Sequence, residues 1–234
     1  MNILGLIPAR GGSKGITQKN IVNLAGKPLV AYTCEAAKSC LKLDRIILNT
    51  DDQDIARVGA AYGVEVPFLR PTELADDETP ILPVIQHTLK WFEENEGECF
   101  DIVVLLQPTS PLRQSPHIDA AVDLILESNA DTVVSVQAVP HNFTPDSIMQ
   151  IDENGYLKPF MEGELVLRRQ EKPLVFARNG PAVLAVQRRV IEADRLYGDH
   201  VLPLEMTSIE SIDIDDETDL LMAEALLNLK RGVQ

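Results

Sequence analysis

The chain is short of positive charge. Among its 234 residues, 21 are Lys or Arg and 36 are Asp or Glu, which gives a net charge of −15 with His neutral. Nucleic acids and anionic membranes bind proteins largely through clustered basic side chains. The shortage argues against nonspecific binding to nucleic acid or to a membrane surface. An anionic ligand must therefore be held by a local group of cations.

Cysteines and long apolar runs are also scarce. Cys34, Cys40 and Cys99 form no C-x-x-C pattern, which indicates reduced thiols in a cytoplasmic protein. No stretch approaches the ~20 apolar residues of a membrane span, and the first apolar run is too short for a signal peptide. The hydrophobic content of 45% is nevertheless ample for a core.

Apolar segments of strand length alternate with helical patterns up to residue 136. The expected strands cover 3–7, 45–49, 64–69, 101–106 and 132–136, and the expected helices cover 28–40, 53–62, 80–94 and 115–127. Thr79 is the expected N-cap of the third helix. Apolar strands that alternate with helices predict an α/β fold, a mostly parallel sheet with helices on both faces. We expect a single domain over residues 1–234.

The alternation breaks between about residues 140 and 178, where we expect an insertion that acts as a lid or a dimer contact. A hairpin is expected near 147–157, followed by a basic cluster of Arg168, Arg169 and Lys172. A strand resumes at 183–186, a short strand is expected at 210–216, and a last amphipathic helix at 216–230.

The first strand empties into a loop rich in glycine and positive charge. Residues 8–15 read Pro-Ala-Arg-Gly-Gly-Ser-Lys-Gly. Glycine lets the backbone approach an anion closely, and successive N–H groups can form an anion-binding concavity. The spacing matches neither the Walker loop nor G-x-G-x-x-G. The loop therefore predicts a phosphate cradle of another kind, with a simple tight turn as the alternative.

Two further polar stretches directly follow strands. They are Thr50-Asp51-Asp52 and the proline-rich segment 107–113. Because ligands of parallel sheets bind outside the carboxyl ends of the strands, we expect both stretches to converge with the glycine loop. Thr50-Asp51-Asp52 is equally compatible with a helix N-cap and with a part of the ligand site.

Asp213 and Asp215 alternate along the expected strand at 210–216, so their side chains should share one face. Two adjacent carboxylates repel unless a cation or proton neutralises them, and Mg²⁺ is usually held by one or two carboxylates plus substrate phosphates. The alternative is a solvated acidic strand end. Asp216 should lie on the other face and cap the last helix. The four histidines show no metal-site spacing, and no Ser-His-Asp pattern is present.

Together these motifs resemble the acylneuraminate cytidylyltransferases, which activate sialic acids as CMP-sugars. The matching segments occur in the family's order over nearly the whole chain. They are 7–15 with 19–20, 50–51, 69–71 with 73–75, 107–113, 169–170, 179–180 and 211–215.

The resemblance implies a Rossmann-like nucleotidyltransferase fold that is usually dimeric, with the inserted segment reaching into the partner. It implies a reaction of CTP with a nonulosonic (sialic-type) acid that releases pyrophosphate, with Arg10, Lys19 and Asp213 as catalytic residues. The implied nucleotide contacts are Ala9, Arg10, Gly11, Gly12, Ser13, Lys19, Asn20, Arg70 and Thr79. The implied sugar contacts are Gln107, Arg169 and Asn179, and the implied Mg²⁺ ligands are Asp213 and Asp215.

The departures from the family's pattern border the expected sugar pocket. Residues 16–18 lack the family's usual proline, an arginine is displaced to Arg178, and residues 181–184 are less aromatic than in sialic acid enzymes. The acceptor is therefore open, and legionaminate or another sugar acid fits equally well. Kdo enzymes, with a different first loop, fit less well. A nucleotidyltransferase for another sugar and a catalytically silent nucleotide-binding protein remain the alternatives.

Overall fold

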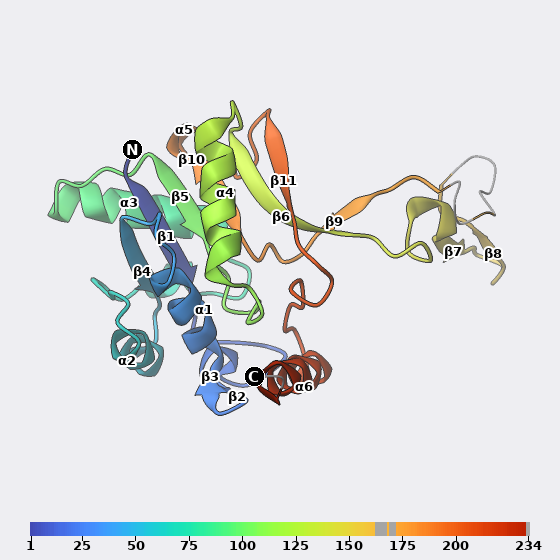
Figure 1. Ribbon diagram of the computed structural model, residues 1–234, viewed down its shortest axis with the longest axis horizontal. Coiled ribbons are helices and arrows are strands. Elements are labelled where there is room, and N and C mark those ends of the chain that lie inside the picture. The colour runs from blue at the N-terminus through green and yellow to red at the C-terminus, as the bar shows by residue number, and fades with distance from the viewer. Residues whose placement is uncertain (162–167, 169–171, 233–234) are drawn as a thin grey trace.

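The computed structural model describes residues 1–161, 168 and 172–232 (Figure 1). Its central sheet has the strand order β11-β6-β10-β5-β1-β4, and β9 pairs with the far part of β6. The strands are β1 (Ile3–Pro8), β4 (Arg45–Asn49), β5 (Ile102–Leu105), β6 (Thr132–Ala138), β9 (Phe176–Arg178), β10 (Leu184–Gln187) and β11 (Val201–Glu205).

The sheet is mixed but mostly parallel. β1 runs parallel to β4 and β5, and β11 runs parallel to β6. β10 is antiparallel to both of its neighbours, β5 and β6. Because β10 is reversed, its beginning lies at the same edge as the carboxyl ends of β1, β4 and β5. That edge therefore collects the loops after three parallel strands and the segment that enters β10.

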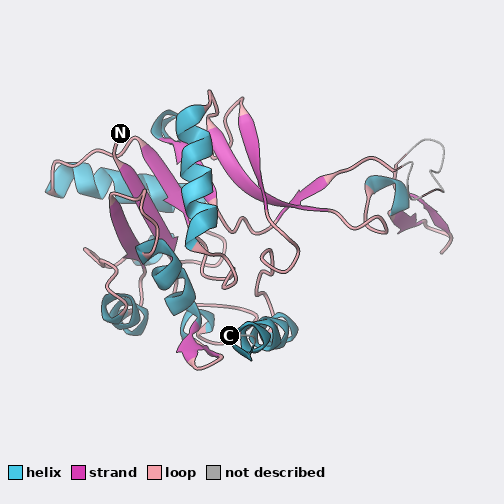
Figure 2. Cartoon of the chain, viewed as in Figure 1, coloured by secondary structure: helices cyan, strands magenta, loops and turns pink. Residues whose placement is uncertain are grey.

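Helices cover both faces of the sheet (Figure 2). The alternation of side chains along each strand explains why, because successive residues point to opposite faces. Ile7 and Leu48 pack in one apolar cluster with α1 (Leu29–Lys38), α2 (Gln53–Ala61) and α4 (Ser115–Glu127). Leu6 and Ile47 pack in a second cluster with α3 (Ile81–Asn95) and α5 (Arg188–Glu192). The predicted α/β fold, mostly parallel with helices on both faces, is confirmed.

A third apolar cluster lies beyond the sheet and joins the two ends of the chain. It contains Ile16 of the glycine loop, Leu24 of β2 (Asn23–Leu24), Leu29 of α1, Ile214 and Ala223 of α6 (Glu217–Gly232). β2 pairs with β3 (Lys27–Pro28), and the short helix η1 (Lys19–Ile21) precedes them. This cluster positions the segment before α6 against the first loop.

An arm extends from the far end of β6 and β9 (Figure 1). It carries the helix η3 (Pro145–Ser147) and a hairpin of β7 (Met149–Ile151) and β8 (Leu157–Pro159), and the figure shows this hairpin apart from the central sheet. The expected hairpin is thus present. Within the described residues, no helix combines the length and the apolar character that a membrane crossing requires.

The strand expected at 64–69 forms only in part. Two isolated parallel bridges, Ile47 to Glu65 and Thr50 to Leu69, connect this segment to the β4 edge. Pro67 stands between them and has no N–H to give to a continuous ladder. The expectation of a regular strand at 64–69 was therefore wrong.

Two local expectations near the site were wrong. Residues 212–215 are not a strand, because the segment's backbone bonds run to loops: Ile214 N–H donates to Thr109 O at 2.8 Å. Thr79 is not the N-cap of α3; Pro80 holds that position, and Thr79 Oγ1 is 3.5 Å from Glu73 O. The third residue of α3 is Pro83, which has no N–H, so one of the two donors that an N-cap side chain would normally accept from is absent. The α5 helix and β11 were not anticipated.

Candidate active site

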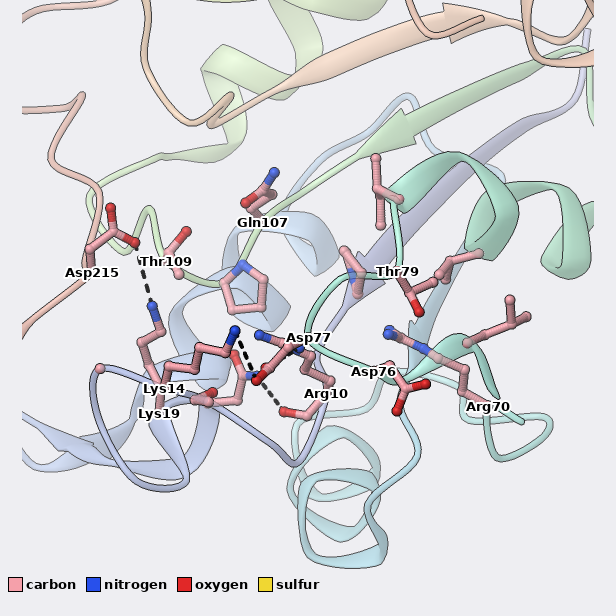
Figure 3. Close-up of a pocket in the computed structure, with 18 of the residues that line it drawn as sticks. Arg10, Lys14, Lys19, Arg70, Asp76, Asp77, Thr79, Gln107, Thr109 and Asp215 are labelled. Atoms are coloured by element: carbon pink, nitrogen blue, oxygen red, sulfur yellow. Dashed lines mark hydrogen bonds and ion pairs between the residues drawn. The ribbon is translucent and has the colours of Figure 1, made fainter. Parts of the chain in front are cut away.

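A cavity of about 470 Å³ opens at the carboxyl edge of β1, β4 and β5 (Figure 3). The loops that follow β1 and β5 supply much of its wall, together with the segments 70–84 and 213–215. The predicted site residues that line it are Arg10, Ser13, Lys19, Asn20, Arg70, Thr79, Gln107, Asp213 and Asp215. Residues from both ends of the chain thus meet in one cavity, as the parallel topology requires.

The glycine loop is held in place by the stretch after β4. Asp51 Oδ1 accepts a hydrogen bond from Gly11 N–H at 2.9 Å, and Asn20 Nδ2 donates to Arg10 O at 2.8 Å. Asp52 caps α2, because its Oδ1 accepts from the N–H groups of Asp54 and Ile55. The helix-cap interpretation is therefore confirmed for Asp52, and Asp51 positions the glycine loop.

Not every predicted nucleotide contact reaches the cavity through its side chain. Ala9 is fully buried, and its N–H donates to Asn49 O at 3.0 Å. Gly11 and Gly12 are absent from the cavity lining. A Cβ added at Gly12 would meet no atom within 4 Å, so the backbone here is open to an incoming group. Any contact of these three residues with a nucleotide must therefore be made by their backbone.

Three of the four cations that line the cavity form ion pairs with carboxylates (Figure 3). Lys19 Nζ donates to Ile214 O at 2.8 Å and lies 3.6 Å from Asp215 Oδ1. Arg10 Nη1 lies 2.6 Å from Asp77 Oδ1, and Lys14 Nζ lies 3.3 Å from Asp77 Oδ2. The positive field of the cavity is thus balanced by acids of the same chain.

Arg70 is fixed at the base of the cavity. Its Nε donates to Asn49 Oδ1 at 2.5 Å and its Nη2 donates to Asn49 O at 2.8 Å. Burial lowers the pKa of Arg70 to about 10, although the charge of Asp51 acts in the opposite direction. The guanidinium is therefore charged at neutral pH, and Asn49 sets its orientation.

Asp213 and Asp215 lie at the opposite side of the cavity (Figure 3 labels Asp215). Burial raises the pKa of Asp213, and the neighbouring charge of Asp215 adds to that effect. Among the described residues, Asp213 Oδ1 is buried without a hydrogen-bond partner. A buried carboxylate oxygen without a donor is costly unless a cation or a proton satisfies it. The pair therefore fits a Mg²⁺ ion that also takes ligands from a substrate.

The described residues contain no group of three or more His, Cys, Asp and Glu side chains that could hold a metal by themselves. Two carboxylates with open positions are typical of Mg²⁺ bound jointly by protein and substrate phosphate. Any ion here would thus depend on a bound substrate for part of its coordination.

The glycine loop and the aspartate segment are in direct contact. A Cβ added at Gly15 would lie only 2.3 Å from Asp215 O, a distance that no real side chain tolerates. Glycine at position 15 is therefore required for the two segments to meet. This contact brings Gly15 and Asp215, which lie far apart in the sequence, to the wall of the same cavity.

Residues 107–109 line the far end of the cavity, and the segments 110–113 and 179–182 adjoin them without lining it. Gln107 Nε2 donates to Gly180 O at 3.3 Å. Arg113 is buried, and its Nη1 donates to Gln107 O at 2.9 Å and to Ala182 O at 2.8 Å. Arg113 thereby ties the two segments together from behind.

Asn179 lies beneath the cavity surface rather than in its lining. Its Oδ1 accepts from Ser135 Oγ at 2.6 Å and its Nδ2 donates to Ser211 Oγ at 2.8 Å, and the residue is 3% exposed. Its amide thus holds the segment in place, and a contact with a sugar would require these bonds to open. Arg169, the other predicted sugar contact, lies outside the described residues.

Sequence reasoning left four lining residues with polar or charged side chains out of the site. They are Lys14, Asp76, Asp77 and Thr109. Lys14 and Thr109 belong to motifs already noted, so their inclusion would have followed from the loops alone. The acids of the 70–78 loop offered only a polar composition as a signal, and their position over the glycine loop comes from the tertiary structure.

Comparison with known proteins leads to the same family as the motifs. The model of a family described as "Cytidylyltransferase" matches residues 4–226. The chain is 38% identical to a CMP-N,N'-diacetyllegionaminic acid synthase of Legionella pneumophila, over 99% of this chain and 98% of that protein. It is 31% identical to an N-acylneuraminate cytidylyltransferase of Escherichia coli, over 94% of this chain and 51% of that protein.

A solved structure shares the fold. It is a CMP:2-keto-3-deoxy-manno-octonic acid synthetase complexed with CTP, with a TM-score of 0.72 and 15% identity, covering 98% of this chain and all of the other. That low identity supports the architecture only. The family match and the relatives with over 30% identity extend along almost the full chain. The chain belongs to the cytidylyltransferase family.

Proposed function

We propose that the protein transfers CMP from CTP to the anomeric hydroxyl of a nonulosonic acid and releases pyrophosphate. The observation that carries the proposal is the cavity itself. It combines a cationic glycine loop with a buried, unpartnered carboxylate oxygen of Asp213, in a chain whose relatives are CMP-nonulosonic acid synthases. A phosphate cradle facing a pair of acids is what metal-assisted phosphoryl chemistry needs.

The triphosphate is assigned to the glycine loop. The open backbone at Gly12 leaves room for phosphate oxygens, and Arg10, Ser13 and Lys19 line the adjacent wall. Arg70, Asn20 and Thr79 lie in the same cavity and are assigned to the ribose and base. Fixed N–H groups and cations stabilise the negative charge that develops as a phosphoryl group transfers.

The acceptor is assigned to the far end of the cavity, near Gln107 and the 179–182 segment. Its hydroxyl attacks the α-phosphorus in line, a new P–O bond forms, and the bond to pyrophosphate breaks. The hydroxyl proton is assigned to the Asp213 carboxylate, which lines the same cavity. Arg169 is proposed for the sugar carboxylate, on the resemblance to the family and on the bidentate geometry of guanidinium.

Asp213 and Asp215 are the proposed ligands of a Mg²⁺ ion. When bound, such an ion neutralises phosphate charge and orients the reacting groups. Lys19 supports the same region, because its ammonium joins η1 to Ile214 O, the residue between the two aspartates. The side chains thus have separate roles: the cations bind the pyrophosphate leaving group, and Asp213 and Asp215 act beside the attacking hydroxyl.

The arm at about 140–178 is proposed as an inserted segment that forms a homodimer. Support comes from its exposed apolar side chains, which would be costly to leave in water. They include Phe143, Ile151, Tyr156, Leu157, Phe160, Met161 and Leu174. A cytoplasmic location is proposed as well, supported by free thiols at Cys34, Cys40 and Cys99.

The acceptor is tested with a panel. N,N'-diacetyllegionaminic, N-acetylneuraminic and pseudaminic acids, with Kdo for comparison, are each incubated with CTP, and pyrophosphate release is measured. We expect release with at least one nonulosonic acid, and legionaminate is the first candidate because two relatives at 38% and 32% identity carry that name. Binding of CTP without turnover of any acid would support a silent nucleotide-binding protein instead.

Lys19→Ala tests the phosphate assignment. We expect kcat/KM to fall by ~10²- to 10³-fold, the usual cost of removing a group that stabilises charge in the transition state. Lys38→Ala, at the exposed end of α1, is the matched control and should retain the wild-type rate. Turnover by Lys19→Ala close to the wild-type value would show that this residue has been assigned wrongly.

Asp213→Asn tests the metal assignment. Removing the charge should raise the Mg²⁺ concentration for half-maximal activity at least about tenfold, in line with the cost of disturbing a metal site. A titration of activity with MgCl₂ measures this concentration. Glu217→Gln removes a nearby exposed charge at the start of α6 and should leave the Mg²⁺ concentration for half-maximal activity unchanged. Wild-type activity that persists in EDTA would rule the metal out.

Ile151→Lys combined with Leu157→Lys tests the dimer. These residues pair across the β7–β8 hairpin. A dimer formed through this hairpin would bury both lysine charges, and the cost of their burial opposes association. Sedimentation equilibrium should give twice the 25.8 kDa chain mass for the wild type and the single mass for the variant. Leu41→Lys, 92% exposed in the loop after α1, should remain dimeric. A wild type that sediments as a monomer would contradict the assignment.

A further inference from the structure

We propose that Asp77 is an internal counter-ion of the phosphate cradle, a carboxylate that holds the loop cations in the free protein and must be displaced by CTP or pyrophosphate. This inference rests on the proposed function, because it concerns the same cavity. It assigns a role to a residue that belongs to none of the motifs by which the family is matched.

The geometry divides one carboxylate between two cations. Asp77 Oδ1 lies 2.6 Å from Arg10 Nη1, and Asp77 Oδ2 lies 3.3 Å from Lys14 Nζ. Figure 3 shows the Asp77 side chain between these two residues, at the glycine loop. A carboxylate that offers one oxygen to each of two cations takes the place of an anionic ligand. Asp77 thus occupies a position suited to a phosphate group.

The two anions cannot share the same cations. A triphosphate or pyrophosphate that contacts Arg10 and Lys14 brings several negative charges next to the Asp77 carboxylate, and like charges at such distances repel. The cavity also holds Asp76, Asp213 and Asp215, so with Asp77 its four carboxylates match its four cations and leave no formal excess of positive charge. Binding of the ligand must therefore break both ion pairs of Asp77.

The loop that carries Asp77 is suited to such an exchange. Asp77 stands between the short helix η2 (Thr72–Leu74) and α3, and its side chain is 37% exposed. Within the described part of the chain, its carboxylate forms ion pairs with Arg10 and Lys14. The neighbouring backbone is held independently, since Thr79 N–H donates to Asp76 O at 3.1 Å. The side chain can therefore move into water while the loop keeps its shape.

The consequence concerns affinity and release. A carboxylate that returns to the cations whenever the anion leaves lowers the affinity for every anionic ligand of the loop. It also favours departure of the pyrophosphate product, because the vacated cations are neutralised at once. Arg10 and Lys14 thus remain paired throughout the cycle, first with Asp77, then with phosphate, and again with Asp77.

Asp77→Asn is the decisive variant, with Glu78→Gln as the matched control. Both remove one negative charge, but Glu78 is exposed and absent from the cavity lining. Calorimetric titration with inorganic pyrophosphate, without divalent cations, measures Kd for each protein. We expect Asp77→Asn to bind roughly three- to tenfold more tightly than the wild type, the scale of partly exposed ion pairs. Glu78→Gln should stay within about twofold.

Salt supplies a second readout that a purely structural role would not move. The difference in pyrophosphate Kd between Asp77→Asn and the wild type should shrink as ionic strength rises, because salt screens exposed charge pairs. Unchanged or weaker pyrophosphate binding by Asp77→Asn would overturn the proposal, since Asp77 would then be idle or would help to hold the anion. An equal gain in pyrophosphate affinity for Glu78→Gln would overturn it too, because the loss of any one negative charge in this loop would then explain the effect.

The titration separates this inference from the proposed reaction. No sugar acid takes part in it, so tighter binding by Asp77→Asn supports the counter-ion even if every acceptor in the panel fails. Conversely, CMP transfer together with unchanged pyrophosphate affinity in Asp77→Asn would support the reaction and overturn the counter-ion.

Discussion

The site depends on how Ile214 is fixed between two acidic residues. Its side chain is fully buried in the cluster with Ile16 and Leu29, its N–H donates to Thr109 O, and its carbonyl accepts from Lys19 Nζ at 2.8 Å. One residue thereby joins the first loop, the loop after β5 and the segment before α6. With Ile214 turned into the apolar cluster, Asp213 and Asp215 are left facing the cavity. Burial of one apolar side chain thus orients two carboxylates.

A second constraint is charge balance in an acidic protein. A net charge of −15 disfavours anions at most of the surface, so the cavity must concentrate its cations. The chain keeps those cations ordered with its own acids: Asp77 beside Arg10, and Asp215 beside Lys19. Arg70 is held by the neutral Asn49 instead, and stays available for a ligand. The cavity is therefore preorganised, and ligand binding exchanges one set of ion pairs for another.

The sequence predicted the parts of this arrangement that depend on local pattern. The Arg45–Asn49 strand, the Asp52 cap and the convergence of the loops after β1 and β5 follow from apolar runs and parallel topology. What it missed depends on long-range contact. Residues 212–215 look like a strand by alternation, but their backbone bonds go to Thr109 and Lys19. Similarly, nothing in the local pattern around Asn179 indicates that Ser135 and Ser211 occupy its amide.

The most direct test of this site is a crystal structure with Mg²⁺ and a non-hydrolysable analogue of CTP. We predict the triphosphate at the backbone of residues 11–13, beside Arg10 and Lys19, with a metal ion at Asp213 and with the Asp77 carboxylate moved away from Arg10. A nucleotide bound outside this cavity, or a triphosphate that leaves Asp213 without a cation and the Arg10–Asp77 pair intact, would contradict the proposed site.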